Sequence, residues 1–290
     1  GQKSWERAEA KMLERAADLA LSKAKVYADG VDVFLGGDLL NQIVSSGYTA
    51  RQLGIPFLGL YGACSTMAES LLLGAMLIDG GFADTALCAT CSHFSTAERQ
   101  YRFPLELGNQ RTPTAQWTVT GAGATLLGRE SLLPLCIESV TIGSVWDLKQ
   151  TDANNMGAAM APAAMQTLKS HLDDLHRIPE DYDLIVTGDL GRVGYDLMKL
   201  LCRKEGIELD QRYIDCGCEI FDVSQDVHSG GSGCGCSAVS LNGWLLRRML
   251  KGEIRKMLFL ATGALMSPTM SQQGESIPGV AHAVSLEVMP

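Results

Sequence analysis

The most informative segment of the chain is Gly62-Ala63-Cys64-Ser65-Thr66, which joins a predicted strand to a predicted helix. The strand covers Ile55 to Tyr61. The helix covers Thr66 to Ile78 and carries small or apolar residues on nearly all of its faces. Because such a helix has almost no polar side to turn to water, we expect it at the centre of the fold.

Cys64 lies where this central helix begins. A thiol in that place faces unpaired backbone N–H groups and the positive end of the helix dipole, and both favour the thiolate. That environment suits the nucleophile of an acyl-transfer enzyme. A small buried cysteine that only packs at a crowded turn is the alternative, and the local sequence leaves both interpretations open.

The pattern around Cys64 recurs later in the chain. The segment from Asp32 to Leu39 matches the segment from Asp183 to Leu190 at an offset of 151 positions, and Cys64-Ser65 matches Cys236-Ser237 at an offset of 172. Two further matches share the second offset and pair Gly80 with Gly252 and Ala89-Thr90 with Ala261-Thr262.

These matches predict two similar α/β halves, in which strands alternate with helices and form parallel sheets with covered faces. The first half is expected over residues 1–150 and contains the Cys64 helix. The second half is expected over residues 151–290 and contains the Cys236 helix.

The second half has a glycine-rich turn before its central helix, in the stretch from Ser229 to Cys236. Glycine lets a backbone approach a ligand closely. If the pseudo-symmetry aims this helix start and the Cys64 helix start at one place, the two N-termini form an anion-binding site that includes Ser232 and Gly233. A tight turn without a ligand is the alternative.

Histidines and strand-end aspartates are the other candidate site residues. His93 follows the strand after the Cys64 helix, and His228 precedes the glycine-rich turn. Asp38 and Asp189 each follow a glycine at the end of a predicted strand. In a pocket either aspartate would serve as an acid, a base or a cation ligand, whereas a helix-capping role is the alternative for both.

Composition excludes several classes of function. The formal net charge is -9, and the densest basic cluster is only Arg247, Arg248 and Lys251. A groove for nucleic acid is therefore not expected. No apolar run reaches the roughly 18 residues of a membrane span. Nine cysteines in a chain that opens on a charged helix favour reduced thiols in the cytosol and no secretory signal.

The Gly-Ala-Cys-Ser helix start, the duplicated core and the glycine-rich turn resemble the thiolase and ketosynthase superfamily. The resemblance implies a thiolase fold with five layers, α/β/α/β/α, and an acyl-accepting role for Cys64. It also implies a homodimer through the edge of the first-half sheet, which we expect near the segment from Cys88 to His93.

The catalytic set of that superfamily is incomplete in this chain. Asp189 lies where the ketosynthases have a histidine, and an aspartate beside Cys64 disfavours the thiolate. The second partner of the cysteine falls on Ser232 by one alignment and on His228 by another, and both alignments stay open. We therefore expect a non-enzymatic role, with an acyltransferase or condensing enzyme that uses Cys64 as the alternative.

A closer resemblance runs along the whole chain, to the stage V sporulation protein AD family of endospore formers. That family has a further N-terminal segment with an early strand, so we expect such a segment to be missing before Gln2. The matching blocks are Gln2 to Glu6, Gly37 to Gln42, Gly62 to Thr66, Thr96 to Gln100, Met160 to Ala164, Gly230 to Cys234 and Ala261 to Thr269.

This second resemblance implies a protein that binds dipicolinic acid (pyridine-2,6-dicarboxylate) and helps to load it into the developing spore. It implies peripheral attachment to the cytoplasmic face of the forespore inner membrane, through membrane proteins of the same operon. A scaffold that only docks those proteins is a further alternative. No cofactor is expected, except Ca²⁺ as the dipicolinate chelate, held by Asp189. The residues expected to bind the ligand are Cys64, Asp189, His93, His228, Ser232 and Gly233.

Overall fold

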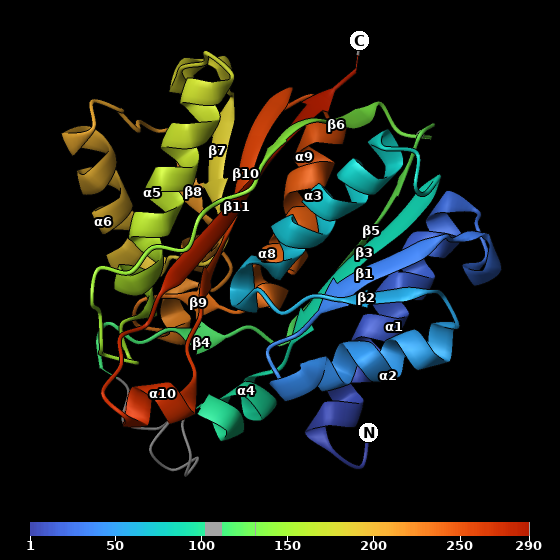
Figure 1. Cartoon of the computed structure of the whole chain (residues 1–290), viewed down its shortest axis with the longest axis horizontal. Helices are drawn as coiled ribbons and strands as arrows, with labels where there is room; N and C mark the ends of the chain where they lie inside the picture. The colour runs from blue at the N-terminus through green and yellow to red at the C-terminus, as the bar shows by residue number, and fades with distance from the viewer. Residues whose placement is uncertain (102–111, 131, 290) are drawn as a thin grey trace.

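The computed structural model describes residues 1–101, 112–130 and 132–289. Two sheets face each other across a central pair of helices, and further helices cover the outer face of each sheet (Figure 1). The predicted five-layer α/β/α/β/α arrangement is therefore observed.

The first sheet has the strand order β2-β1-β3-β5. Strands β2 and β3 pair parallel with β1, and β5 pairs antiparallel with β3. Its strands are β1 (Val33–Gly37), β2 (Phe57–Gly59), β3 (Thr85–Ser92) and β5 (Gly121–Gly128). The helices of this half are α1 (Trp5–Ala24), α2 (Val44–Leu53), α3 (Thr66–Asp79) and α4 (Phe94–Tyr101).

The second sheet has the strand order β6-β11-β10-β7-β8. Its strands are β6 (Leu135–Thr141), β7 (Leu184–Thr187), β8 (Tyr213–Asp215), β10 (Lys256–Ala264) and β11 (Gly279–Val288). Its helices are α5 (Met156–Asp174), α6 (Gly191–Lys204), α7 (Cys216–Glu219), α8 (Cys234–Ser240), α9 (Leu246–Leu250) and α10 (Pro268–Gln272), with a π-helical turn at Leu241–Leu245 between α8 and α9.

The two sheets repeat one topology. The order β2-β1-β3-β5 corresponds to β8-β7-β10-β11, with the same parallel and antiparallel pairings. Strand β6 is additional and pairs antiparallel with β11. The boundary predicted at residue 150 is therefore wrong for β6, because strand pairing divides the two sheets between β5 and β6.

The two halves share one core. Helix α3 contributes Leu71 and the π-helical turn contributes Leu241, and both belong to a buried cluster with Leu35 of the first sheet and Phe259 of the second. A small two-stranded sheet also joins the halves, with β4 (Trp117–Thr118) parallel to β9 (Gly231–Ser232). The central layer therefore depends on both halves for its packing.

The segment expected near the free edge of the first sheet lies inside the sheet. The segment from Cys88 to His93 lies in and just after β3, which pairs with β1 on one side and β5 on the other. The two outer strands of this sheet are β2 beside β1 and β5 beside β3, so the segment lies one strand in from the β5 edge. Among the described helices, none is both long enough and apolar enough to cross a membrane.

Candidate functional site

A sharp turn positions Cys64 between β2 and α3. Ala63, Cys64 and Ser65 form a short 3-10 turn, and the α-helix begins one residue later. Ala63 has a φ of 52°, in the left-handed region that residues with a Cβ rarely adopt. Such strain concentrates at functional sites, and here it sets the direction of the side chain that follows.

Strand β10 of the other half approaches this turn closely. A Cβ on Gly263 would lie 2.5 Å from the Gly62 carbonyl oxygen, so any larger residue would push the turn away. This contact brings the end of β10 beside Cys64, which is 5% exposed.

Asp189 anchors the glycine-rich turn beside Cys64. Its Oδ2 accepts hydrogen bonds from Ser232 Oγ at 3.0 Å and from the Gly233 N–H at 2.8 Å. Its Oδ1 accepts a hydrogen bond from Thr262 Oγ1 at 2.7 Å. Ser232 Oγ lies 3.9 Å from Cys64 Sγ. Gly233 has a φ of 103°, which favours glycine at this position.

Four of the six predicted site residues therefore lie together, namely Cys64, Asp189, Ser232 and Gly233. The other two, His93 and His228, lie elsewhere. The Nδ1 atom of His93 accepts from the Ser95 N–H at 3.1 Å, at the start of α4. The Nδ1 atom of His228 lies 2.8 Å from the Thr112 carbonyl oxygen. Neither histidine lines the small pocket that opens in front of Cys64. Of the two alignments left open, the structure brings Ser232 and not His228 to the cysteine.

The electrostatic environment keeps the Cys64 thiol protonated. Burial raises the pKa of Cys64 well above its ordinary value, and the Asp189 carboxylate raises it further. The predicted effect of Asp189 is confirmed. The prediction that the helix start lowers this pKa is wrong, because desolvation of a fully buried thiolate outweighs the helix dipole. Burial also raises the pKa of Asp189, to about 6.

A small pocket opens in front of Cys64, with a volume of about 40 Å³. Since one water needs about 10–15 Å³, it holds only a few waters in this state. Tyr101 closes one side and donates a hydrogen bond of 2.6 Å to the Leu39 carbonyl oxygen. The lining residues are Leu39, Ala63, Cys64, Ala97, Glu98, Tyr101, Thr118, Met156, Ser232, Ala264 and Met266.

Sequence reasoning missed several of these lining residues. Tyr101 ends α4, Met156 begins α5, and Met266 follows β10. The block from Thr96 to Gln100 that carries the family resemblance ends one residue before Tyr101. No spacing rule joins these three elements, so only the folded arrangement brings them together.

A metal centre is not formed by the protein alone in the part of the chain that is described, where no three His, Cys, Asp or Glu side chains group to hold an ion. Both carboxylate oxygens of Asp189 already accept hydrogen bonds.

Solved structures of other proteins share this fold. The 3-oxoacyl-(acyl-carrier-protein) synthase III of Aquifex aeolicus VF5 has a TM-score of 0.62 at 14% identity and covers 99% of this chain and 86% of that chain. Acetamide-bound OleA of Xanthomonas campestris has a TM-score of 0.61 at 15% identity and covers 96% of this chain and 81% of that chain. These similarities establish the thiolase-like fold.

Sequence relatives identify a narrower group. The stage V sporulation protein AD of Bacillus subtilis (strain 168) is 48% identical over 286 residues, which are 99% of this chain and 84% of that protein. The family model described as stage V sporulation protein AD matches residues 1–287. The chain therefore belongs to the stage V sporulation protein AD family.

Proposed function

We propose that this protein binds dipicolinate in the pocket between the starts of α3 and α8, and that binding serves the loading of dipicolinate into the developing spore. The observation that carries the proposal is that Asp189, and not a histidine, lies beside Cys64. Asp189 takes the place of a base, is held by three donors, and raises the pKa of the thiol. The cysteine is present in the pocket, but its surroundings disfavour the thiolate that acyl transfer needs.

The charges of the pocket favour a calcium chelate over the free dianion. The described lining contains one carboxyl group, Glu98, and no lysine or arginine, and Asp189 lies directly behind Ser232. Free dipicolinate would meet like charge from these residues. In the chelate the cation neutralises the ligand, and its remaining coordination sites prefer oxygen atoms.

The pocket must widen to take such a ligand. Ligand sites in proteins are usually about 300–1,000 Å³ in volume, far above the present space. Met156 and Met266 lie on the lining and are only partly buried. Because methionine is unbranched and flexible, these two side chains are the ones that move aside at least cost. Ser232 Oγ, Thr118 Oγ1 and Tyr101 Oη then supply hydrogen bonds to the ligand.

Calorimetric titration with dipicolinate, with and without Ca²⁺, tests this proposal. We expect saturable binding with Ca²⁺, weaker binding in the presence of a chelator, and a loss of about tenfold in affinity for Cys64→Ala and Asp189→Asn. His228→Ala is the matched control, because His228 lies outside the pocket. Absence of saturation in every condition, or an equal loss in the His228 variant, contradicts the proposal.

One observation favours a second candidate, a working acyltransferase or condensing enzyme. The strained Ala63 aims Cys64 into the pocket as a nucleophile would be aimed. Incubation with an acyl-CoA followed by mass spectrometry distinguishes the two candidates. The binding proposal predicts no thioester, whereas an adduct on Cys64 that Cys64→Ala abolishes would establish the enzyme.

For the assembly we propose a homodimer that docks on membrane proteins of the same operon at the cytoplasmic face of the forespore inner membrane. The outer edge of β2 supports the dimer, because Leu58 is 52% exposed there and the strand pairs only with β1 in the described chain. Leu58→Glu should shift the sedimentation coefficient toward that of a monomer. An unchanged coefficient would exclude β2 as the contact.

A further inference from the structure

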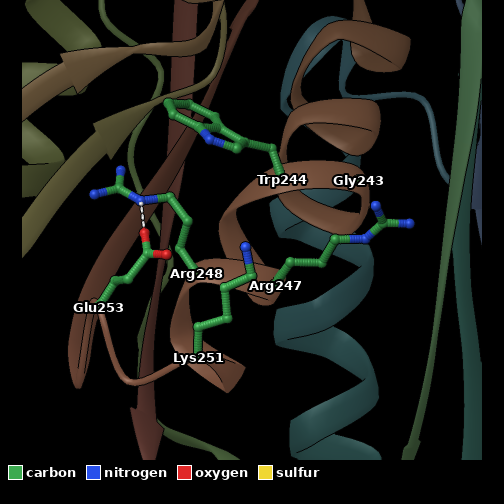
Figure 2. A pocket seen from close by; sticks show the side chains of 6 residues that line it. All are labelled: Gly243, Trp244, Arg247, Arg248, Lys251 and Glu253. Carbon is green, nitrogen blue, oxygen red and sulfur yellow. Dashed lines mark hydrogen bonds and ion pairs between the residues drawn. The ribbon is translucent and has the colours of Figure 1, made fainter.

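The helix that follows the glycine-rich turn carries an unusual outer face. Trp244, Arg247, Arg248 and Lys251 are spaced i, i+3, i+4 and i+7, so they share one side of the helix. Figure 2 shows these side chains projecting from the same stretch of helix. We call them, together with Gly243 and Glu253, the basic hollow. Its volume is about 410 Å³.

Folding does not require this face. The opposite side of the helix is buried through Leu241, Leu245 and Met249, which belong to the shared core. The offset of 172 positions relates Trp244 and the three cations of the basic hollow to positions of α3. The corresponding residues there are Leu72, Ala75, Met76 and Asp79. The equivalent helix of the first half therefore lies in the same layer without an aromatic residue or a cation at these positions.

Two of the cations are free to meet a partner. Arg248 Nε is 3.0 Å from Glu253 Oε2, and its guanidinium lies 5.4 Å from the centre of the Trp244 ring. Arg247 and Lys251 are exposed, and neither forms an ion pair or hydrogen bond with any described side chain. Cations near a helix C-terminus interact favourably with its dipole. That effect accounts for the charges but not for an exposed tryptophan between them.

The helix also changes its winding at this face. The π-helical turn at Leu241–Leu245 contains Gly243 and Trp244, and it lets the following residues continue as α9. Wide turns of this kind are rare and are frequently found at functional sites. Here the wide turn places the indole ring, which is 36% exposed, at the rim of the hollow.

We propose that the basic hollow docks an acidic segment of a protein partner, with carboxylates on Arg247 and Lys251 and an apolar side chain on Trp244. Tryptophan and arginine are the side chains that contribute most at protein interfaces. A lipid surface fits less well. Each cation contributes only about 1 kcal/mol toward an anionic membrane, and lipid-binding clusters usually hold 4–8 of them. The chain as a whole, at a formal net charge of -9, would be repelled by that membrane.

This docking leaves the ligand pocket accessible. The pocket lies at the start of α8, and the hollow extends from the π-helical turn to the end of α9; Figure 1 shows where these helices lie. At 1.5 Å per residue, Trp244, the nearest side chain of the hollow, lies about 15 Å along the helix from Cys234, and Lys251 lies about 25 Å away. The proposal is therefore independent of dipicolinate binding and stands if that binding fails.

Fluorescence anisotropy with a labelled short peptide of glutamates around a central leucine pair tests the proposal. The triple variant R247E/R248E/K251E should lose at least about tenfold in affinity, and Trp244→Ala should lose less. The control triple R15E/K23E/K204E makes the same change in net charge on exposed positions of α1 and α6. It should bind as the parent does. Circular dichroism verifies that each variant is folded.

Three results overturn the proposal. The first is equal binding by the parent and R247E/R248E/K251E. The second is an equal loss in the control triple, which would show that only overall charge matters. The third is binding of phosphatidylserine vesicles, but not of the peptide, in a manner that depends on Arg247 and Lys251, which would assign the hollow to a membrane. A lysine version of the peptide must fail to bind.

Discussion

Asp38 and Asp189 follow corresponding strands of the two halves, yet they accept hydrogen bonds from different parts of the structure. Asp38 is bound within its own half, by the Leu40 N–H and by the N–H and Oγ of Ser46. It therefore holds the loop that leads into α2. Asp189 instead accepts hydrogen bonds from Thr262 of β10 and from the turn before α8, and it reaches the pocket through Ser232.

Another residue holds the corresponding loop in the second half. Asp215 at the end of β8 accepts hydrogen bonds from Thr187 Oγ1 and from the N–H groups of Leu190, Gly191 and Cys218. These contacts hold the start of α6. Because Asp215 holds the start of α6, Asp189 is free to hold the turn that contains Ser232. Of the two corresponding aspartates, Asp38 therefore holds a loop, whereas Asp189 supports the pocket through Ser232.

The largest expected effect is on Asp215. Asp215→Ala leaves four donors without this acceptor, three of them backbone N–H groups that cannot turn elsewhere. We expect the free energy of unfolding to fall by about 4 kcal/mol, partly offset by removal of a buried carboxylate. Urea unfolding measures it, with Asp222→Ala in an exposed turn as the control. A loss below about 1 kcal/mol would refute the structural role.

Asp38→Ala should have a smaller effect, a loss of about 2 kcal/mol in the free energy of unfolding. Fewer backbone donors are orphaned, and removing the carboxylate also removes repulsion with Glu9. Dipicolinate binding should stay unchanged, whereas Asp189→Asn should weaken it. If Asp38→Ala weakens binding as much as Asp189→Asn does, the two aspartates do not differ as we describe.

A third test concerns Glu9, the buried neighbour of Asp38. Burial, together with the Asp38 charge, raises the pKa of Glu9 to about 7. The folded protein therefore holds this proton more tightly than the unfolded chain does. The stabilisation is complete below the unfolded pKa and is lost as pH rises through 7. Between pH 5 and pH 8 the parent should lose about 2 kcal/mol more stability than Glu9→Gln. Parallel pH profiles would show that Glu9 does not titrate there.

The smallest effect should appear at the Cys64 thiol. Asp189→Asn removes a charge that raises the pKa of Cys64 but leaves the thiol buried. We therefore expect alkylation of Cys64 by iodoacetamide near pH 8 to accelerate only several-fold, as followed by mass spectrometry. Asp38→Asn is the matched control. An unchanged rate in Asp189→Asn would mean that the carboxylate does not govern the thiol.

Much of the fold was readable in the sequence because local signals agreed with one another. The repeat at offset 172 correctly paired the start of α3 with that of α8, and the apolar character of α3 placed it in the central layer. Strand β6 was misassigned because periodicity says nothing about which sheet a connecting strand joins. The order of the strands in the first sheet was not predictable for the same reason, since it depends on long-range pairing.

The site was only partly predictable. Cys64, Asp189, Ser232 and Gly233 were found because each sits at a strand end or helix start, and the topology brings those ends together. His93 and His228 share that kind of location, but their ring nitrogens bond to nearby backbone instead. The pKa of Cys64 could not be judged from a helix start alone, because the degree of burial decides its sign.

A crystal structure of the protein with calcium and dipicolinate tests the central claim most directly. The account predicts ligand density between Cys64, Ser232 and Tyr101, with Met156 or Met266 displaced from the position it holds now. The calcium should lie on the side of Asp189. Density for the ligand at any other place, or an unchanged pocket in crystals grown at saturating ligand, would contradict the assignment of this pocket as the dipicolinate site.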